Sequence, residues 1–456
     1  MQHRMLLVSA SLAFLWCGCA QPSSLTGTTP KVAQLTRVAA STGKIQHVVI
    51  IIQENRSFDN IFAGFPGADA PLTGLRHNGK RVSLHQATFQ QYPNVDIKHD
   101  YRHSQIEYDA GKMDGFDEDV WMNGQPAKTY PYAYLSRKQV APYWTMATQY
   151  TLVDHMFPTV WGPSFTAHLD LIAGTTVVNR SPSRTVSEID YPYNQNNPNW
   201  TCAAQPPPPS YILVDTKGSI AETGGGPPPC FTQFHTMADT LDAAHVSWRY
   251  YAPALSTGSG QLWSSFAAIS NVYNGPDWGN VIAPETTVLK DISNGKLPSV
   301  AWVVPAVNNS DHGGSGSDTG PSWVAAIVNT LGESAYWNST AIVVLWDDWG
   351  GWYDDAPPPQ LDFMGLGFRV GCIVISPYAK AGTVSHTQYE YGSILKFVEQ
   401  TFGAASLGYT DARANSLLDS FDFTQAPITF KKIPAKYPPS YFLKQRPSGK
   451  VPDDDD

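Results

Sequence analysis

The sequence predicts an α/β fold in which helices flank a mainly parallel central sheet. Four apolar runs rich in β-branched residues, each bounded by polar or glycine-containing segments, are typical of buried strands; they lie at residues 45–53, 299–307, 339–347 and 368–376. Helical patterns occur between and after these runs, at residues 236–246, 321–333 and 391–403. Strands that alternate with helices favour a sheet of mainly parallel strands.

Composition limits the classes of function. Of the 456 residues, 42% are hydrophobic and only 15% are charged, which indicates a globular protein. The formal net charge of −9 disfavours a nucleic-acid partner, because phosphate backbones are bound by basic surfaces. We expect no transmembrane span, since the longest apolar run is cut off at Asp347.

The chain begins like an exported protein. His3 and Arg4 precede the apolar run of residues 5–16, which is too short to cross a bilayer and is typical of a secretion signal. Cys17 and Cys19 lie where bacterial lipoproteins carry an acylated cysteine, so a lipid anchor and a plain secretion signal both stay open. We therefore expect a periplasmic, secreted or envelope-anchored protein. Its expected parts are a secretion or lipoprotein signal at 1–20, a flexible leader at 21–43, one domain at 44–443 and an acidic tail at 444–456.

Residues 179–230 differ from the rest of the domain. Proline and glycine are too dense there for regular structure, which predicts an insertion. Cys202 and Cys230 are natural disulfide partners in an oxidising compartment, and the alternative is that they and Cys372 are free thiols. Cys372 lies in an apolar run and should be a buried strand residue. Three cysteines this scattered do not indicate a zinc site.

Two of the predicted strands run directly into polar residues that include acids. The run VVIIIQ leads into Glu54 and Asn55, and the run AIVVLW leads into Asp347 and Asp348. Ligands of open α/β sheets bind beyond the carboxyl ends of the strands. Three carboxylates and an amide gathered there would repel one another unless a divalent cation shared them. The alternative is that these side chains cap helices or bind loop backbone.

Ser164 lies in a second kind of candidate position, within TVWGPSFTAHLDLIAGT. Gly162 and Pro163 force a turn, which places the serine at or next to the first turn of a helix. The positive end of that helix would stabilise both an alkoxide and an incoming phosphate. A plain helix cap is the alternative.

These motifs together resemble a bacterial phosphoesterase family that comprises the non-toxin-type phospholipases C and the related acid phosphatases. The resemblance covers about residues 47–403, and its landmarks are ENRSFDN at 54–60, DIKH and GKMDGF within 96–116, VWGPS at 160–164, VSWRYY at 246–251, WDDWGGWYDDAPPP at 346–359 and GFRVGCIVISPYAK at 367–380. It implies an alkaline-phosphatase-like fold, a three-layer sandwich around a mainly parallel sheet. It also implies a site centred on a divalent metal cation of unknown identity, with matching positions at Glu54, Asn55, Ser164, Asp347 and Asp348.

Two histidines of this chain match histidines of the family. They are His99, in DIKHDYRH, and His312, in NNSDHGGSGS. A histidine near a leaving oxygen can donate a proton as that oxygen gains charge. His103, four residues after His99, is the alternative to it, and His386 is either a helix-entry residue or a further site histidine.

The chain departs from the family's pattern after the acidic pair and near the last predicted helix. Residues 352–355 replace a motif that contains histidine in many members, and Tyr391 stands where members often have another histidine. Both changes bear on leaving-group specificity rather than on the metal centre. We expect Arg56 and Asp59 to brace their loop by pairing with each other or with backbone.

The resulting hypothesis is hydrolysis of phosphate esters, in which Ser164 attacks phosphorus and a phosphoserine is then hydrolysed, while His312 and His99 assist the leaving group. A serine nucleophile and an Asp-Asp pair are more similar to the acid phosphatase branch, since the phospholipases commonly show threonine and Asp-Glu. One alternative is a phospholipase C acting on phosphodiesters of choline lipids, for which the 14 Trp and 22 Tyr could furnish an ammonium cage. Another is a noncatalytic secreted binding protein that keeps the fold. The expected partner is a small phosphate ester or a phospholipid, and the oligomeric state is left open.

Overall fold

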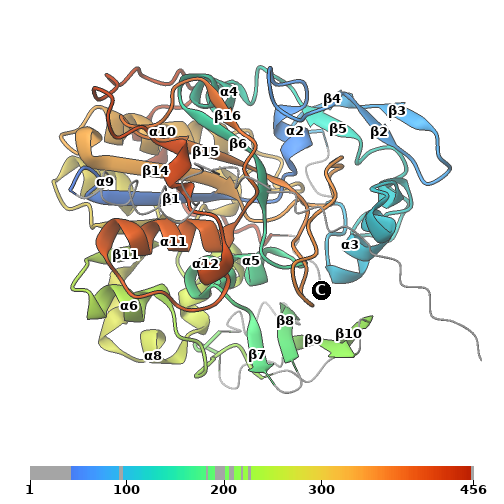
Figure 1. Cartoon of the computed structure of the whole chain (residues 1–456), viewed down its shortest axis with the longest axis horizontal. Helices are drawn as coiled ribbons and strands as arrows, with labels where there is room; N and C mark the ends of the chain where they lie inside the picture. Colours follow the sequence, from blue (N-terminus) through green and yellow to red (C-terminus); the bar gives the residue numbers. More distant parts are fainter. Residues whose placement is uncertain are drawn as a thin grey trace, which may run out of the picture.

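A central sheet flanked by helices confirms the predicted α/β architecture (Figure 1). The computed structural model describes residues 43–91, 96–180, 183–189, 201–204, 210–216, 219–223 and 227–452. Within these residues the sheet has nine strands in the order β12-β11-β13-β1-β14-β15-β6-β16, with β17 also paired to β6. The strands are β12 (Val281–Ile282), β11 (Trp248–Tyr251), β13 (Val300–Val303), β1 (His47–Gln53), β14 (Thr340–Trp346), β15 (Val370–Ile375), β6 (Thr151–Phe157), β16 (Thr383–Ser385) and β17 (Tyr389–Glu390).

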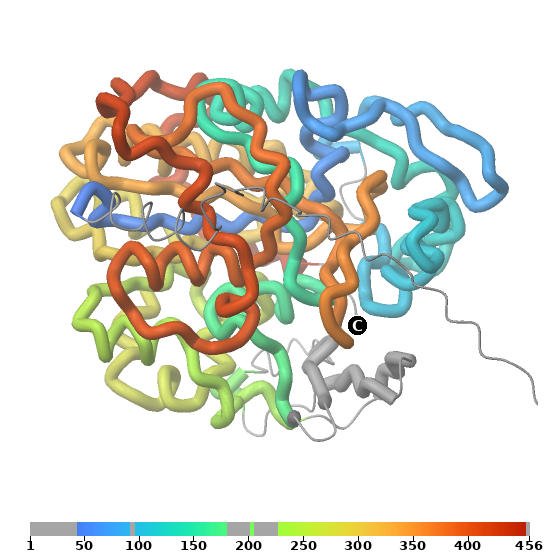
Figure 2. The backbone as a smooth tube through the Cα atoms, in the orientation of Figure 1, coloured from blue at the N-terminus to red at the C-terminus, as the bar shows by residue number. Residues whose placement is uncertain are grey.

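Most neighbouring strands are parallel, as the sequence predicts. The exception is β15, which runs antiparallel to both β14 and β6. In the middle of the sheet, β1 lies between β13 and β14, visible in Figure 2 as a blue segment beside orange ones. Residues 48–52 of β1 are completely buried, because the sheet is covered on both faces and each side chain of the strand meets a helical layer.

Two helical layers enclose the sheet (Figure 1). One contains α10 (Gly320–Gly332), α9 (Thr287–Ser293) and α4 (Ala141–Gln149), and the other contains α5 (Ser164–Ala173), α11 (Tyr391–Phe402) and α6 (Met237–Ala243). Four of these six were predicted as helices: α6, α10 and α11 from their apolar periodicity, and α5 from the turn at Gly162 and Pro163. The remaining short elements are α2 (Phe58–Phe62), α3 (Tyr101–Tyr108), α7 (Gly258–Leu262), α8 (Ser270–Tyr273), α12 (Thr410–Arg413), α13 (Pro439–Phe442), β2 (Thr73–Leu75), β3 (Arg81–Ser83), β4 (His85–Ala87) and β5 (Ala133–Leu135).

The segment predicted to lack regular structure contains most of a second sheet, so that part of the prediction is wrong. Four antiparallel strands form it in the order β10-β9-β8-β7; they are β7 (Val177–Arg180), β8 (Ser183–Ile189), β9 (Ser210–Thr216) and β10 (Ser219–Thr223). The strands use the β-branched stretches that lie between the proline and glycine runs, and most of those runs fall outside the described residues. The predicted disulfide between Cys202 and Cys230 is present, and Cys372 is a buried free thiol on β15.

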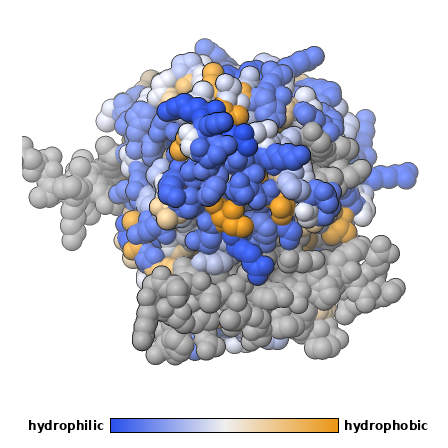
Figure 3. Space-filling model, turned by 90° about the vertical axis from the view of Figure 1, so that its right-hand side faces the viewer, coloured by the Kyte–Doolittle hydropathy of each residue, from blue (hydrophilic) through white to orange (hydrophobic). Residues whose placement is uncertain are grey.

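The ends of the chain differ in how much the structure describes. The predicted signal and all but the last residue of the leader lie outside the described residues, as do the last four residues of the predicted acidic tail. The rest of that tail packs on the protein, since Gln445 accepts a hydrogen bond from Asn309 and Val451 packs against the core. Among the described helices, none has the length and apolarity that a membrane crossing needs. The face shown in Figure 3 is mostly hydrophilic, with apolar side chains in small separate groups, which is ordinary for a protein surface.

Candidate active site

The polar pairs that follow β1 and β14, Glu54-Asn55 and Asp347-Asp348, lie side by side at one edge of the sheet. Gln53 is aligned with Trp346 in the parallel ladder, so Glu54 and Asp347 leave the sheet at the same level. The backbone N–H of Asn55 donates to Asp347 Oδ1 over 2.9 Å, which ties the two strand ends together. Asn55 has a φ of +54°, a left-handed conformation that costs free energy and is typical of functional positions.

Ser164 meets this edge from the first residue of α5, as its sequence context predicts. Its hydroxyl donates to Asp348 Oδ2 over 3.2 Å and accepts from Asn55 Nδ2 over 3.1 Å. The same amide nitrogen lies 3.3 Å from Asp348 Oδ2. All three side chains are completely buried. The structure therefore brings the predicted nucleophile, the amide and one acid within hydrogen-bonding distance of one another.

Glu54 and Asp347 share a partner that the sequence reasoning missed. His168 Nε2 lies 2.9 Å from Glu54 Oε1 and 3.6 Å from Asp347 Oδ2, and all three residues are completely buried. His168 follows Ser164 by four residues on α5, so both side chains lie on the same face of the helix. That spacing is the signal by which the histidine could have been found.

The donor set fits a divalent cation. Asn55 Oδ1 and Asp347 Oδ2 are buried oxygen atoms without a hydrogen-bond partner. Burying such an atom costs free energy unless a ligand supplies the missing contact. Glu54, Asp347 and Asp348 bring three buried carboxylates together, and one imidazolium at His168 would offset at most one of their charges. Burial alone would raise the pKa of Asp347, but attraction by His168 and the hydrogen bond from the backbone N–H of Asn55 lower that pKa to about 2. The carboxylate stays ionised, as a metal ligand must.

Of the two histidines considered upstream of GKMDGF, His99 faces the site. Its Nε2 lies 2.8 Å from Asn55 Nδ2, and its Nδ1 lies 2.8 Å from the carbonyl oxygen of Ile97. His103 instead contacts Asp100 over 2.8 Å. Because a carbonyl can only accept, the hydrogen of a neutral His99 belongs on Nδ1, and Nε2 is then an acceptor that orients the amide of Asn55.

His312 lies beside His99, with 6.2 Å between the ring centroids. Its Nδ1 is 3.3 Å from Asp96 Oδ2, and both side chains are buried. At this distance Asp96 acts through its charge, which favours a hydrogen on the ring nitrogen that faces it. Trp263 packs on the ring at 5.7 Å, and Trp349 meets the edge of His99 at 6.1 Å, so the two histidines have aromatic neighbours.

The last histidine considered, His386, is held elsewhere. It contacts Asp154 over 2.8 Å and does not cap α11, which begins five residues later. Tyr391, where the resemblance led us to expect a histidine, does reach the site: its hydroxyl donates to the carbonyl oxygens of Trp346 and Asp347. Burial, reinforced by the nearby acids, raises the pKa of Tyr391 well above its ordinary value, so the side chain stays a donor.

Two glycines let the loop after β14 approach two neighbouring segments, at Asn55 and at Ile97. Gly350 has a φ of +62°, and a Cβ built on it would lie 2.4 Å from the carbonyl oxygen of Asn55. Gly351 has a φ of +71°, and its Cβ would lie 2.4 Å from Ile97. Only glycine combines this backbone conformation with such close contacts.

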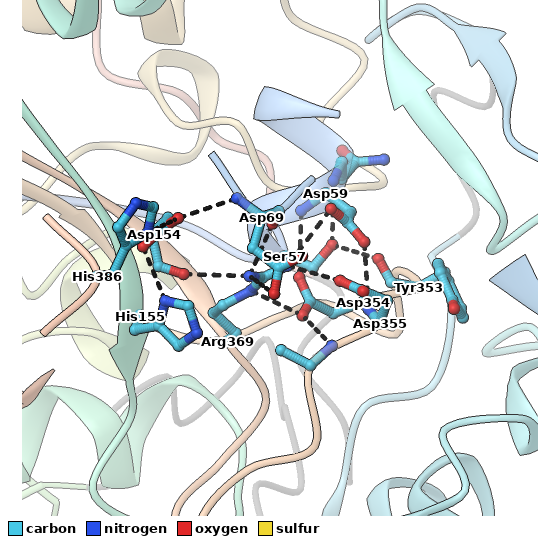
Figure 4. A network of polar contacts seen from close by, with 12 residues as sticks. Ser57, Asp59, Asp69, Asp154, His155, Tyr353, Asp354, Asp355, Arg369 and His386 are labelled. Atoms are coloured by element: carbon cyan, nitrogen blue, oxygen red, sulfur yellow. Dashed lines mark hydrogen bonds and ion pairs between the residues drawn. The ribbon is translucent and has the colours of Figure 1, made fainter. Parts of the chain in front are cut away.

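Arg56 and Asp59 both brace the loop that follows Asn55, but they do not pair with each other. Arg56 donates to the carbonyl oxygen of Asp311 over 2.7 Å, which confirms the expected pairing with backbone. Its guanidinium also stacks 4.6 Å from the ring of Trp352. Asp59 pairs with Arg369 over 3.4 Å rather than with Arg56 (Figure 4).

Asp354 and Asp355, in the segment 352–355 that differs from the expected motif, belong to the same ion-pair network as Asp59. Arg369 also contacts Asp354 and Asp355, each over 2.9 Å (Figure 4). Burial raises the pKa of Asp354 to about 7 although Arg369 opposes it. Asp354 and Asp355 therefore both serve the ion-pair network in this structure.

The sequence matches a family model described as the Phosphoesterase family across residues 45–405. Similar curated proteins include hemolytic phospholipase C of Pseudomonas aeruginosa, 24% identical over 84% of this chain and 56% of that protein. Phospholipase C A of Mycobacterium tuberculosis is 25% identical, with 84% and 78% of the two chains covered. The chain thus spans little more than half of the first of these relatives. Among solved structures, a protein in the alkaline phosphatase superfamily from Vibrio parahaemolyticus is 11% identical with a TM-score of 0.39, covering 84% of this chain and 73% of that one.

Proposed function

The chain belongs to the phosphoesterase family, and on that premise we propose that it is a metal-dependent hydrolase that cleaves phosphate esters through a phosphoserine at Ser164. The observation that carries the proposal is the contact of a buried serine hydroxyl, at the N-terminus of α5, with both Asn55 and Asp348. A helix N-terminus favours the negative charge of an alkoxide and of a phosphoryl group. The three residues thus provide a nucleophile and the groups that orient it.

The cation would be held by Glu54, Asn55, Asp347 and Asp348, with Ser164 as a further ligand. When bound, it would lower the pKa of the serine hydroxyl and offset charge on the phosphoryl oxygens. In the first step a bond forms between Ser164 Oγ and phosphorus as the bond to the ester oxygen breaks. The hydroxyl already donates its hydrogen toward Asp348, which gives the proton a route away from the nucleophile. In the second step water attacks phosphorus, and Ser164 regains its proton as phosphate leaves.

The leaving oxygen needs a proton in the first step. His312 supports this role better than His99, because the contact with Asp96 favours a hydrogen on Nδ1 and protonation then places an acidic hydrogen on Nε2. His99 Nε2 accepts from Asn55, so we assign His99 to holding that amide in place. The two histidines predicted together for the leaving group thereby take different roles.

The substrate class has two candidates. The serine nucleophile and the Asp347–Asp348 pair favour an acid phosphatase that acts on monoesters. The names of the relatives favour a phospholipase C that acts on phosphodiesters of lipids. We propose the monoesterase as the primary activity because both distinguishing residues lie in the site itself.

We also propose that the protein is exported. The N-terminal apolar run is typical of a secretion signal. The disulfide between Cys202 and Cys230 supports an oxidising compartment independently of that run.

The test compares phosphate release from p-nitrophenyl phosphate with phosphocholine release from phosphatidylcholine vesicles, using the purified chain without residues 1–20. Ser164→Ala should lower either turnover by at least a thousandfold. Ser322→Ala is the matched control, because Ser322 is also a buried serine in the first turn of a helix, α10. Chelation should abolish turnover and added cation should restore it. Full turnover by Ser164→Ala would refute the mechanism, and a metal-free protein that hydrolyses neither substrate would support a noncatalytic binding protein.

A further inference from the structure

Among the described residues outside the candidate active site, one cluster combines an acid with two histidines at hydrogen-bonding distance. Asp154 and His155 lie in β6, and His386 lies between β16 and β17. His155 Nδ1 is 2.7 Å from Asp154 Oδ1, and His386 Nδ1 is 2.8 Å from Asp154 Oδ2 (Figure 4). One ligand atom from each of the three residues lies within 4.8 Å of the others. Two imidazoles thus converge on one carboxylate.

The backbone around the cluster fixes its geometry. β16 pairs with β6 at Ser385 and Val153, and β17 pairs with β6 at Tyr389 and Met156, so the segment with His386 crosses directly over Asp154. The carboxylate is oriented by a second contact, since the backbone N–H of Asp69 donates to Asp154 Oδ2 over 2.9 Å. A preorganised carboxylate loses little entropy when it binds a ligand.

The cluster is open to solvent on its histidine side. The side chain of Asp154 is fully buried, whereas those of His155 and His386 are 29% and 60% exposed. An ion from solvent can therefore reach the carboxylate through the two imidazoles. Burial would raise the pKa of Asp154, but hydrogen bonds from His155 and from the backbone of Asp69 lower it overall, so the anion is available as a ligand.

We propose that Asp154, His155 and His386 bind a divalent transition-metal ion of the zinc type, at a site built from residues other than those around Ser164. Two imidazole nitrogens and one carboxylate oxygen suit Zn²⁺ and neighbouring transition metals rather than Mg²⁺ or Ca²⁺, which prefer oxygen ligands. Bonds of about 2.0–2.2 Å to a tetrahedral ion separate its ligand atoms by roughly 3.3 Å. The three ligand atoms, which lie within 4.8 Å of one another, must therefore rearrange when the ion binds, and the exposure of the two histidine rings leaves room for that movement. Water would complete the coordination.

Such an ion would pin the segment between β16 and β17 to β6, beyond the two short stretches of strand pairing that already hold it. It would also stand next to the Arg369 network, because Arg369 Nη1 donates to the carbonyl oxygen of Asp154 over 3.1 Å (Figure 4). The proposal does not depend on the proposed function, since none of the residues around Ser164 is part of the cluster.

The test is a Zn²⁺ titration of the chelator-stripped full domain, by calorimetry and by metal analysis after dialysis at pH 7.5. His386→Gln and His155→Gln should each bind one Zn²⁺ fewer per chain than wild type, or bind it at least tenfold more weakly. His235→Gln is the matched control, because His235 is 55% exposed and faces one acid, Asp239, at 3.5 Å, with no third ligand among the described residues. The control should bind as wild type does.

A background variant separates this site from the candidate active site. In Asp348→Asn the difference between His386→Gln and His235→Gln should persist whether or not that background loses an ion of its own. Saturating Zn²⁺ should raise the Tm of wild type more than that of His386→Gln, because the ion binds only the folded cluster. Equal stoichiometry, affinity and Zn²⁺-induced Tm shift in His386→Gln, His155→Gln and His235→Gln would overturn the proposal.

Discussion

Ser164 and His168 lie one helical turn apart on α5 and contact two halves of the same acidic cluster. The hydroxyl of Ser164 donates to Asp348 Oδ2 over 3.2 Å, and His168 Nε2 lies 2.9 Å from Glu54 Oε1. A single rigid helix therefore sets the position of the proposed nucleophile and of the side chain that orients the proposed metal ligands. Placing the nucleophile and orienting the metal ligands thus depend on one helix, but substitutions of Ser164 and of His168 test the two roles separately.

His168→Ala should weaken binding of the cation at this site by tenfold or more, because Glu54 and Asp347 lose the imidazole that orients them. Turnover at saturating cation should fall less than turnover at limiting cation, since Ser164 is unchanged. The measurement is activity as a function of free metal concentration, with His235→Ala as the surface control. An unchanged metal dependence in His168→Ala would show that this histidine does not support the ligands.

His312→Gln should lower turnover of alkyl phosphates much more than turnover of p-nitrophenyl phosphate. A poor leaving group needs the proton that His312 supplies in the proposal, whereas p-nitrophenolate leaves readily without one. The effect on the alkyl ester should be roughly a hundredfold or more. The readout is the ratio of kcat/KM for the two substrates, and an equal loss for both would contradict a role in leaving-group protonation.

Gly350→Ala should destabilise the fold more than an alanine at another left-handed glycine. At Gly350 a Cβ would meet the carbonyl oxygen of Asn55 at 2.4 Å, whereas at Gly408, with a φ of +79°, no atom lies within 4 Å. Gly408→Ala should therefore cost only the conformational strain, roughly 1–2 kcal/mol, and Gly350→Ala about 1–3 kcal/mol more for the clash. Urea unfolding of both variants gives the comparison. Equal losses in the free energy of unfolding would mean that the Asn55 loop shifts to accept the added Cβ at no cost.

Glu285 should make stability fall as the pH rises from about 5 to 8. Its side chain is buried, and burial, partly opposed by hydrogen bonds, raises its pKa from an ordinary 4.5 to about 7. Between these two values the folded protein binds more protons than the unfolded chain, so each rise in pH favours unfolding. Since one pKa unit corresponds to about 1.4 kcal/mol, the loss is at most roughly 3 kcal/mol by pH 8.

The glutamate is isolated by comparing two variants in urea unfolding across this pH range. Glu285→Gln should lose less stability on going from pH 5 to pH 8 than wild type does. Glu333→Gln, at an exposed surface glutamate, should follow wild type. A pH profile of Glu285→Gln that parallels wild type would contradict the assignment.

The sequence was sufficient to predict that Glu54, Asn55, Asp347 and Asp348 lie together, because the pairing of two strands determines where these residues lie. Once VVIIIQ and AIVVLW are neighbouring parallel strands, the residues after them must meet, and the alignment of Gln53 with Trp346 leaves Glu54 beside Asp347. Ser164 followed from the turn at Gly162 and Pro163 and from the helix behind it. Each of these residues is placed by a local element.

Other parts of the site and fold depend on contacts that no local pattern encodes. Asp96 reaches His312 across more than two hundred residues from a loop, and nothing in DIKH indicates that pairing. Predicting the pairing of Asp59 with Arg369 requires knowing where β15 lies in the sheet, and β15 is antiparallel to its neighbours. The small sheet of β7–β10 was missed because proline and glycine runs surround its strands, and their composition outweighed the short β-branched stretches.

The central claim is that Glu54, Asn55, Ser164, Asp347 and Asp348 share one divalent cation. Anomalous diffraction from crystals grown with Mn²⁺ tests it most directly, because the signal locates the ion independently of the protein atoms. The account predicts a peak within coordination distance, about 2.0–2.6 Å, of the Ser164 hydroxyl and of oxygens from the Asn55 amide and the three carboxylates. A peak that contacts only Asp96, His99 and His312, or crystals in which this edge of the sheet stays empty at saturating Mn²⁺, would contradict it.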